Sequence, residues 1–225
     1  MKALFGHFLK LSLLLSFSAS GFGQALAASG TERDPQITVR ISNRVHMPAD
    51  SLAQIEQVAT QILRKAGVQA VWLDCSIMVA TDQRQPDCDR PVGPTDFTLI
   101  FVEEIPSLSP RVSQTTLGFA LVPDDGSPGD RAFISNHRAQ DATEWLNASP
   151  ETILGLAAAH EIGHLLMGSS THSCTGLMRA QWDVKDLVRA RQGGLRFTND
   201  QVNQVNAGVV ARMAQQTTVM AAAYR

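Results

Sequence analysis

The segment from Ser149 to Gly168 constrains the fold most strongly, because it predicts a helix that is apolar on nearly every side. Ser149 and Pro150 are typical of a helix start, and Gly168 is typical of a helix end. Between them, Ile153–Met167 carries leucine, isoleucine and alanine all round the helix axis. A helix of this kind is normally buried. We therefore expect it to lie in the protein interior.

Three polar side chains interrupt this helix, namely His160, Glu161 and His164. At about 100° per residue, His164 lies roughly 40° round the axis from His160, so the two imidazoles are one turn apart on one face. Buried polar groups are costly without partners, and two histidines in this arrangement can bind a single Zn²⁺. Glu161, offset from His160 by roughly 100°, would lie beside the ion and could act as general base towards water.

A third ligand has to come from outside the helix, because a catalytic zinc ion takes three protein ligands and keeps one position open. His172 is the leading candidate, since the short polar turn after the helix can fold the chain back towards the metal. The alternatives are Asp183 or Asp186, which would be acidic ligands from the next helix, and the weaker His137 and Cys174.

The run HEIGHLLMGSSTHSCTGLM, from His160 to Met178, resembles the metzincin clan of zinc metallopeptidases. The pattern of that clan is HExxHxxGxxH, followed by a loop and a methionine beneath the metal. The resemblance implies that His160, His164 and His172 bind zinc, that Glu161 is the base and that Met178 is the Met-turn residue. The loop to His172 is longer here than in the pattern. The run is also similar to that of uncharacterised secreted proteins.

The resemblance further implies a zincin-like fold, in which a twisted mixed sheet carries an edge strand above the active-site helix. A peptide substrate would lie along that strand and add to the sheet. Thr116–Val122 is our candidate for it. Some metzincins use a tyrosine just beyond the methionine to stabilise the oxyanion, but Tyr224 is the single tyrosine of this chain. That role therefore falls to the zinc ion, to backbone N–H groups or to another residue.

Periodicity in the rest of the chain predicts an α+β protein whose N-terminal part is α/β-like. Ile37–Ile41 and Val68–Leu73 are typical of strands, and the helix between them would be capped by Asp50 and end before Gly67. Such a strand–helix–strand unit favours a parallel pair. Further strands are expected at Phe97–Val102, Thr116–Val122 and Arg131–Ser135, and C-terminal helices at Asp183–Gln192 and Thr198–Gln215.

Met1–Ala27 has the features of a signal peptide, with two lysines, a short apolar stretch at Leu11–Phe17 and small residues at a cleavage site. The apolar stretch is too short to span a bilayer. We therefore expect a secreted or periplasmic protein with no stable membrane span after cleavage. Residues 28–225 would form a single metallopeptidase domain, and no propeptide is expected.

Export also affects the interpretation of the cysteines. Cys75 and Cys88 flank a polar stretch, and in an oxidising compartment they would pair and close a short loop. Cys174 is then left over. The sequence contains no Cys-x-x-Cys pair, which argues against a cysteine-rich zinc site.

Together these features predict a secreted endopeptidase with one catalytic Zn²⁺, a peptide or protein substrate and Glu161 as the base. A nucleic-acid partner is not expected, because 19 Lys+Arg against 21 Asp+Glu leave no basic excess. One alternative is a secreted zinc-containing binding module without hydrolytic activity. Another is metal-assisted hydrolysis of a bond other than a peptide bond.

Overall fold

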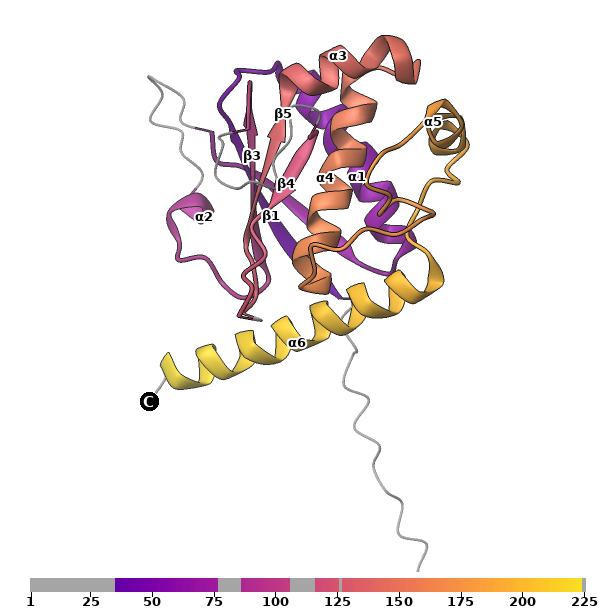
Figure 1. Cartoon of the computed structure of the whole chain (residues 1–225). Coiled ribbons are helices and arrows are strands. Elements are labelled where there is room, and N and C mark those ends of the chain that lie inside the picture. Colours follow the sequence, from indigo (N-terminus) through magenta and orange to yellow (C-terminus); the bar gives the residue numbers. More distant parts are fainter. Residues whose placement is uncertain (1–34, 77–85, 106–115, 126, 224–225) are drawn as a thin grey trace, which may run out of the picture. The chain divides into compact units, whose positions relative to one another are not determined.

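Five strands of the described residues form one mixed sheet (Figure 1). The structure is a computed structural model, and it describes residues 35–76, 86–105, 116–125 and 127–223. The strand order is β2–β1–β3–β5–β4, and all neighbours are parallel except the antiparallel pair β4 and β5. This arrangement confirms the predicted α+β class with a mixed sheet. The strands are β1 (Gln36–Asn43), β2 (Gln69–Asp74), β3 (Asp96–Val102), β4 (Gly118–Ala120) and β5 (Arg131–Ser135).

The predicted signal peptide, Met1–Ala27, lies outside the described residues, and so does Tyr224. All of the described residues belong to one compact unit. Within the described part of the chain, no helix combines the length and the apolar character that a membrane span requires.

The first helix connects β1 to β2, which pair in parallel, so the predicted strand–helix–strand unit is confirmed. Its cap differs from the prediction. Pro48 is the N-cap residue, and Asp50 lies in the first turn, where its charge favours the helix N-terminus. The helices are α1 (Ala49–Lys65), α2 (Pro86–Asp89), α3 (Asn136–Leu146), α4 (Pro150–Met167), α5 (Val184–Arg191) and α6 (Asn199–Ala223).

Helix α3 was not predicted from the sequence. It begins directly where β5 ends, because the Ser135 hydroxyl accepts a hydrogen bond from the Arg138 N–H and caps the helix. Ala139, Ala142 and Leu146 form its buried apolar side. The last residue of β5 thus also caps a helix. The polar residues of α3 outnumber its buried apolar residues, so the helical spacing of the apolar residues is hard to recognise in the sequence.

Helix α4 is the predicted apolar helix, and every residue from Ile153 to Leu166 is buried. The Ser149 hydroxyl caps it by accepting a hydrogen bond from the Thr152 N–H at 3.2 Å. Gly168 ends it in the left-handed conformation, with φ of 62°. The start and the end of this helix therefore agree with the sequence prediction.

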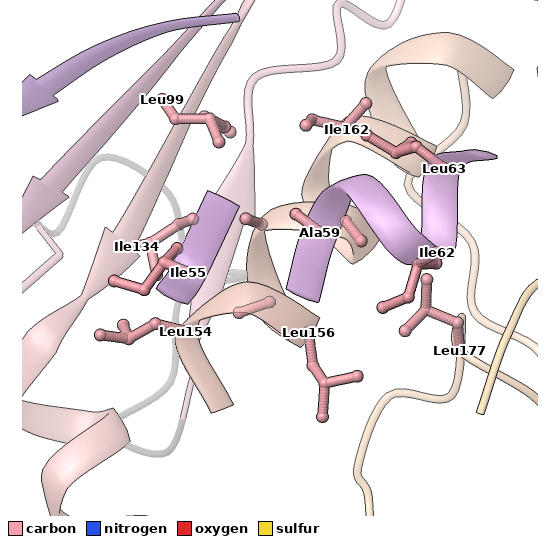
Figure 2. Packing of buried hydrophobic residues seen from close by; sticks show 14 of the residues in the cluster. Ile55, Ala59, Ile62, Leu63, Leu99, Ile134, Leu154, Leu156, Ile162 and Leu177 are labelled. Atoms are coloured by element: carbon pink, nitrogen blue, oxygen red, sulfur yellow. The ribbon is translucent and has the colours of Figure 1, made fainter. Parts of the chain in front are cut away.

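The main core lies where α1 and α4 pack against the sheet (Figure 2). Gly155 lets these helices approach closely, because a methyl group there would lie 2.6 Å from the Cβ of Val58. Side chains from all three elements meet in this layer, including Ile55 and Ala59 of α1, Leu154 and Ile162 of α4, and Leu99 and Ile134 of the sheet.

Helix α6 is longer than the predicted Thr198–Gln215 and is tied to the C-terminal end of α4. The buried Arg212 guanidinium donates to the carbonyl oxygen of Leu165 at 2.9 Å and to that of Gly129 at 2.7 Å. Gly208 lies against the backbone of Leu166, and a side chain there would collide with it. These contacts fix the end of α4 from which the loop to the site departs.

Strand β4 lies at one edge of the sheet, as predicted, but it is shorter than the predicted Thr116–Val122. Backbone hydrogen bonds of Leu117 and Leu121 extend its pairing with β5 by one residue at either end. The Val122 N–H turns back to the Ala120 carbonyl oxygen, and Pro123 has no N–H with which to continue the ladder. The strand therefore ends early.

A disulfide joins Cys75, directly after β2, to Cys88 in α2, which is the pairing favoured by the sequence. The buried Arg40 side chain donates to the carbonyl oxygen of Arg90 at 2.9 Å and to the Asp96 carboxylate at 3.0 Å. The segment after Cys88 is therefore attached to the sheet by the disulfide and by this arginine.

Candidate metal centre

Helix α4 brings His160 and His164 into direct contact. Their Nε2 atoms lie 3.0 Å apart. Both side chains are buried, with 6% and 4% of their surface exposed. The spacing of four residues places the rings one turn apart on one helix face.

A backbone carbonyl group orients each of these rings. Nδ1 of His160 lies 2.9 Å from the carbonyl oxygen of Leu177, and Nδ1 of His164 lies 2.6 Å from that of Ser169. Because a carbonyl oxygen can only accept, each Nδ1 carries the proton and donates it. Each Nε2 is left with a lone pair, and the two Nε2 atoms face one another.

His172 joins this pair from the loop that follows α4. One ring nitrogen of each of the three histidines lies within 4.8 Å of the others. The loop is closed by a 2.8 Å hydrogen bond from the Ser173 N–H to the Met178 carbonyl oxygen, and Ser173 also forms a bridge with Arg179. This closure brings His172 to the helix in spite of the lengthened loop. Unlike the other two, His172 is exposed.

Burial keeps the two helix histidines neutral. Burial, together with the neighbouring imidazoles, lowers the pKa of His160 to about 3 and that of His164 to about 4. Burial also lowers the pKa of His172. The site therefore presents neutral nitrogen donors at neutral pH.

This set of donors fits a zinc ion. Three imidazole nitrogens with a fourth position open are a ligand set of catalytic zinc sites. Two nitrogens that share a tetrahedral zinc ion at about 2.0–2.1 Å stand roughly 3.3 Å apart, close to the 3.0 Å between the two Nε2 atoms. Lone pairs facing at this distance repel unless a cation lies between them. Among the described residues, these histidines are the only group of three or more histidine, cysteine, aspartate or glutamate side chains whose ligand atoms lie close enough to hold one metal ion.

The alternative third ligands lie outside this cluster. Asp183 and Asp186 form the capping box of α5, in which each carboxylate accepts a hydrogen bond from the backbone N–H of the other. Asp186 also pairs with Arg179 and Arg189. Neither these aspartates nor His137 and Cys174 belong to the histidine group.

Glu161 is buried between α4 and the edge strand β4, with 4% of its surface exposed. Burial raises its pKa to about 8, although a hydrogen bond from the Ala120 backbone N–H works in the opposite direction. Gly118 leaves room for it, since a methyl group there would lie 2.7 Å from Cγ and 2.8 Å from Cδ of Glu161. The edge strand therefore holds the carboxylate in place. A carboxyl group with a pKa near neutrality can both accept and return a proton.

Met178 packs against α4 at Gly163. A methyl group at Gly163 would lie 2.9 Å from Sδ of Met178 and 2.7 Å from Cε1 of Phe197. Met178 is buried and follows Leu177, whose carbonyl oxygen orients His160. It therefore supports the loop that holds the first histidine.

A cleft of about 530 Å³ is lined by all three histidines and by Glu161. Strand β4 forms one wall, and helix α3 contributes Arg138, Asp141 and Trp145. The segment 179–182 lines the cleft as well. Trp145 offers apolar surface there, with 55% of it exposed.

The sequence did not predict the cleft residues Arg138, Trp145 and Arg179, whereas Gly118 lies within the predicted edge strand Thr116–Val122. Arg138 and Trp145 come from α3, and no local spacing relates that helix to the histidines. Of these residues, only Arg179 could have been proposed from the sequence, because it directly follows Met178, the predicted Met-turn residue.

No family model matches the sequence, and no curated protein matches it. Archaemetzincin from Methanopyrus kandleri is a similar solved structure, with 17% sequence identity and a TM-score of 0.46, over 79% of this chain and 97% of that chain. A zinc-dependent peptidase from Methanocorpusculum labreanum is also similar, with 15% identity and a TM-score of 0.44, over 75% of this chain and 99% of that chain.

Proposed function

We propose that this protein is a secreted zinc-dependent endopeptidase that hydrolyses peptide bonds with Glu161 as general base. One observation carries the proposal. Three neutral histidines converge in a cleft that also contains a buried carboxyl group of raised pKa. A structural zinc site is closed and needs no base, whereas these side chains line an open cleft.

His160, His164 and His172 would hold one zinc ion, and the carbonyl groups of Leu177 and Ser169 would keep two of the rings in position. Such outer hydrogen bonds fix the tautomer and orientation of a metal-binding histidine. When bound, zinc supplies Lewis acidity, which makes water more acidic and polarises a peptide carbonyl group.

Glu161 would transfer the proton of the attacking water to the leaving amine. Its carboxylate oxygens accept a proton from the attacking water and return it to the nitrogen of the leaving amine. Burial raises its pKa to about 8, and the positive charge of a bound zinc ion would lower the pKa again and favour the carboxylate that accepts the proton. Contact with Gly118 and the Ala120 N–H keeps the carboxylate beside the histidines.

Strand β4 would align the substrate. Among the described strands it pairs only with β5, and all of its residues line the cleft. An extended peptide can add to such a free edge through backbone hydrogen bonds. A peptide bound in this way would place one of its peptide bonds beside Glu161.

Export is part of the proposal, with residues 28–225 as one catalytic domain. The composition of Met1–Ala27 supports it. The disulfide between Cys75 and Cys88 also supports it, because such bonds persist in oxidising compartments.

The test measures zinc content and cleavage of a broad peptide library by the exported protein and three variants. We expect Glu161→Gln to keep one zinc per chain and to lose hydrolysis. We expect His172→Ala to lose zinc and Asp183→Ala to retain it. Full activity of Glu161→Gln would refute the role of the base.

Loss of zinc in Asp183→Ala alone would refute the ligand set. If the wild type binds zinc but cleaves no member of the library, the protein is instead a zinc-containing binding module.

A further inference from the structure

Arg179 is a cleft residue that the proposed chemistry leaves unused. It lines the cleft together with His160, Glu161 and His172. Its backbone also lies close to the histidines in space, because it forms a β-bridge with Ser173, the neighbour of His172. About a third of its side chain is exposed, at 30%.

Two aspartates hold one end of the Arg179 guanidinium. Nη1 donates to the carboxylate of Asp186, which is 1% exposed, and lies 3.5 Å from Oδ2 of Asp183. Both aspartates are themselves fixed as the capping box of α5. The guanidinium is therefore oriented before any ligand arrives, which reduces the entropy lost on binding.

The other edge of the guanidinium, formed by Nε and Nη2, has no acceptor among the residues that the structure describes. The two N–H groups of this edge are parallel and match the two oxygens of a carboxylate. Arg138, the other arginine of the cleft, is different. Its Nη1 donates to Asp141 at 3.2 Å, and its Nη2 donates to Glu104 at 3.3 Å.

We infer that Arg179 determines substrate specificity by binding a carboxylate group of the peptide with its Nε–Nη2 edge. The inference rests on the proposed function, because it places this carboxylate in the cleft that contains Glu161. The carboxylate can belong to an aspartate or glutamate side chain or to a free peptide C-terminus. Both present the same pair of oxygens.

The experiment uses a neutral peptide of alanine, leucine and glutamine with acetyl and amide caps as the parent. One series places a single glutamate at each position in turn, and one peptide keeps the neutral sequence with a free C-terminal carboxylate. Binding is measured on zinc-loaded Glu161→Gln protein, so that it does not depend on turnover. The ratio kcat/KM is measured on the wild type.

We expect one of the carboxylate peptides to be preferred over the parent by about tenfold or more, as for a hydrogen bond to a charged group. The preference should disappear in Arg179→Gln. Arg179→Lys keeps the charge but lacks the bidentate edge, so it should recover only part of the preference. A preference for glutamate identifies a side-chain subsite, and a preference for the free C-terminus identifies recognition of the peptide end.

Arg189→Gln is the matched control. Arg189 also pairs with Asp186, at 3.3 Å, but it does not line the cleft. This variant should keep the preference, as should Arg138→Gln. A preference that survives in Arg179→Gln, that is lost in Arg138→Gln or that is absent in the wild type would overturn the inference. Carboxylate binding that depends on Arg179 without any hydrolysis would overturn the proposed function alone.

Discussion

Trp182 and His160 donate hydrogen bonds to the same acceptor, the carbonyl oxygen of Leu177. The indole Nε1 and the imidazole Nδ1 each lie 2.9 Å from this oxygen. The two rings are also in edge-on contact, with centroids 5.7 Å apart. The loop oxygen that orients the ring of His160, a proposed metal ligand, is therefore itself held by a buried tryptophan.

Replacing Trp182 with phenylalanine should weaken zinc binding. The aromatic bulk remains, but the Leu177 carbonyl loses the donor that fixes it, so His160 is held less firmly. Loss of a group that hydrogen-bonds a metal ligand directly typically costs about 10–100-fold in metal affinity. Trp182 acts one contact further out, through the Leu177 carbonyl, so we expect a loss of about tenfold or less. Competition with a chromogenic chelator measures the dissociation constant.

The control for this variant is Trp72→Phe. The indole of Trp72 donates one hydrogen bond, to Oγ1 of Thr60 at 2.8 Å, and this substitution removes it. Trp72 lies on β2 and does not line the cleft. Its zinc affinity should remain that of the wild type. Equal losses of affinity in both variants would show that Trp182 acts only through general stability.

Gly118→Ala should reduce hydrolysis while zinc remains bound. The new methyl group would collide with Cγ and Cδ of Glu161, and a buried carboxylate has little room to move away. A displacement of about 1 Å at a reacting group can cost about 100-fold in rate. Peptide hydrolysis and zinc content are measured on the same sample.

Gly194→Ala serves as its control, because a methyl group there would meet its nearest neighbour at an ordinary 3.4 Å. It should retain both properties. Normal hydrolysis by Gly118→Ala would argue against the placement of Glu161 under β4.

The sequence predicted those parts of the site that depend on local spacing. The positions of His160 and His164 follow from the helix period alone, and Ser149 and Gly168 mark the ends of that helix. The position of His172 depended on how a loop folds back, and no local rule decides that. In the structure, a hydrogen bond from Ser173 closes the loop.

Residues that reach the site through tertiary contacts could not be predicted. Gly118 gains its role only because β4 crosses over Glu161. Trp145 lies on a helix whose apolar residues are too few to give a clear pattern. The edge strand was predicted as Thr116–Val122 but ends at Ala120, because the Val122 N–H turns back to the Ala120 carbonyl oxygen and Pro123 cannot continue the ladder.

Gly163→Ala should destabilise the protein, although alanine favours helices by about 1 kcal/mol over glycine. The methyl group would overlap with Met178 and Phe197, and overpacking of a core costs about 1–3 kcal/mol. Urea unfolding measures the free energy. In a double-mutant cycle, Phe197→Leu should relieve part of this loss, because it removes the closest ring atom. Strict additivity of the two substitutions would contradict the contact.

Removal of zinc should lower the unfolding temperature. A ligand present at about 1,000 times its dissociation constant stabilises the folded state by about 4 kcal/mol. For a domain of this size that corresponds to roughly 8–16 °C. Differential scanning calorimetry with and without EDTA measures the shift, which should vanish in His172→Ala. A shift of wild-type size in His172→Ala would show that zinc binds without this histidine.

The double variant Cys75→Ser/Cys88→Ser should lower stability without affecting the metal site. The disulfide closes a loop with a sequence separation of 13, and a loop of this length contributes about 3 kcal/mol to the free energy of unfolding. Strand β2 lies at the opposite edge of the sheet from β4. Zinc content should therefore be unchanged while the urea midpoint falls.

A reducing agent should lower the midpoint of the wild type to the same value and leave the double variant unaffected, because Cys174 has no disulfide to lose. Loss of zinc in the double variant would show that the two ends of the sheet are coupled.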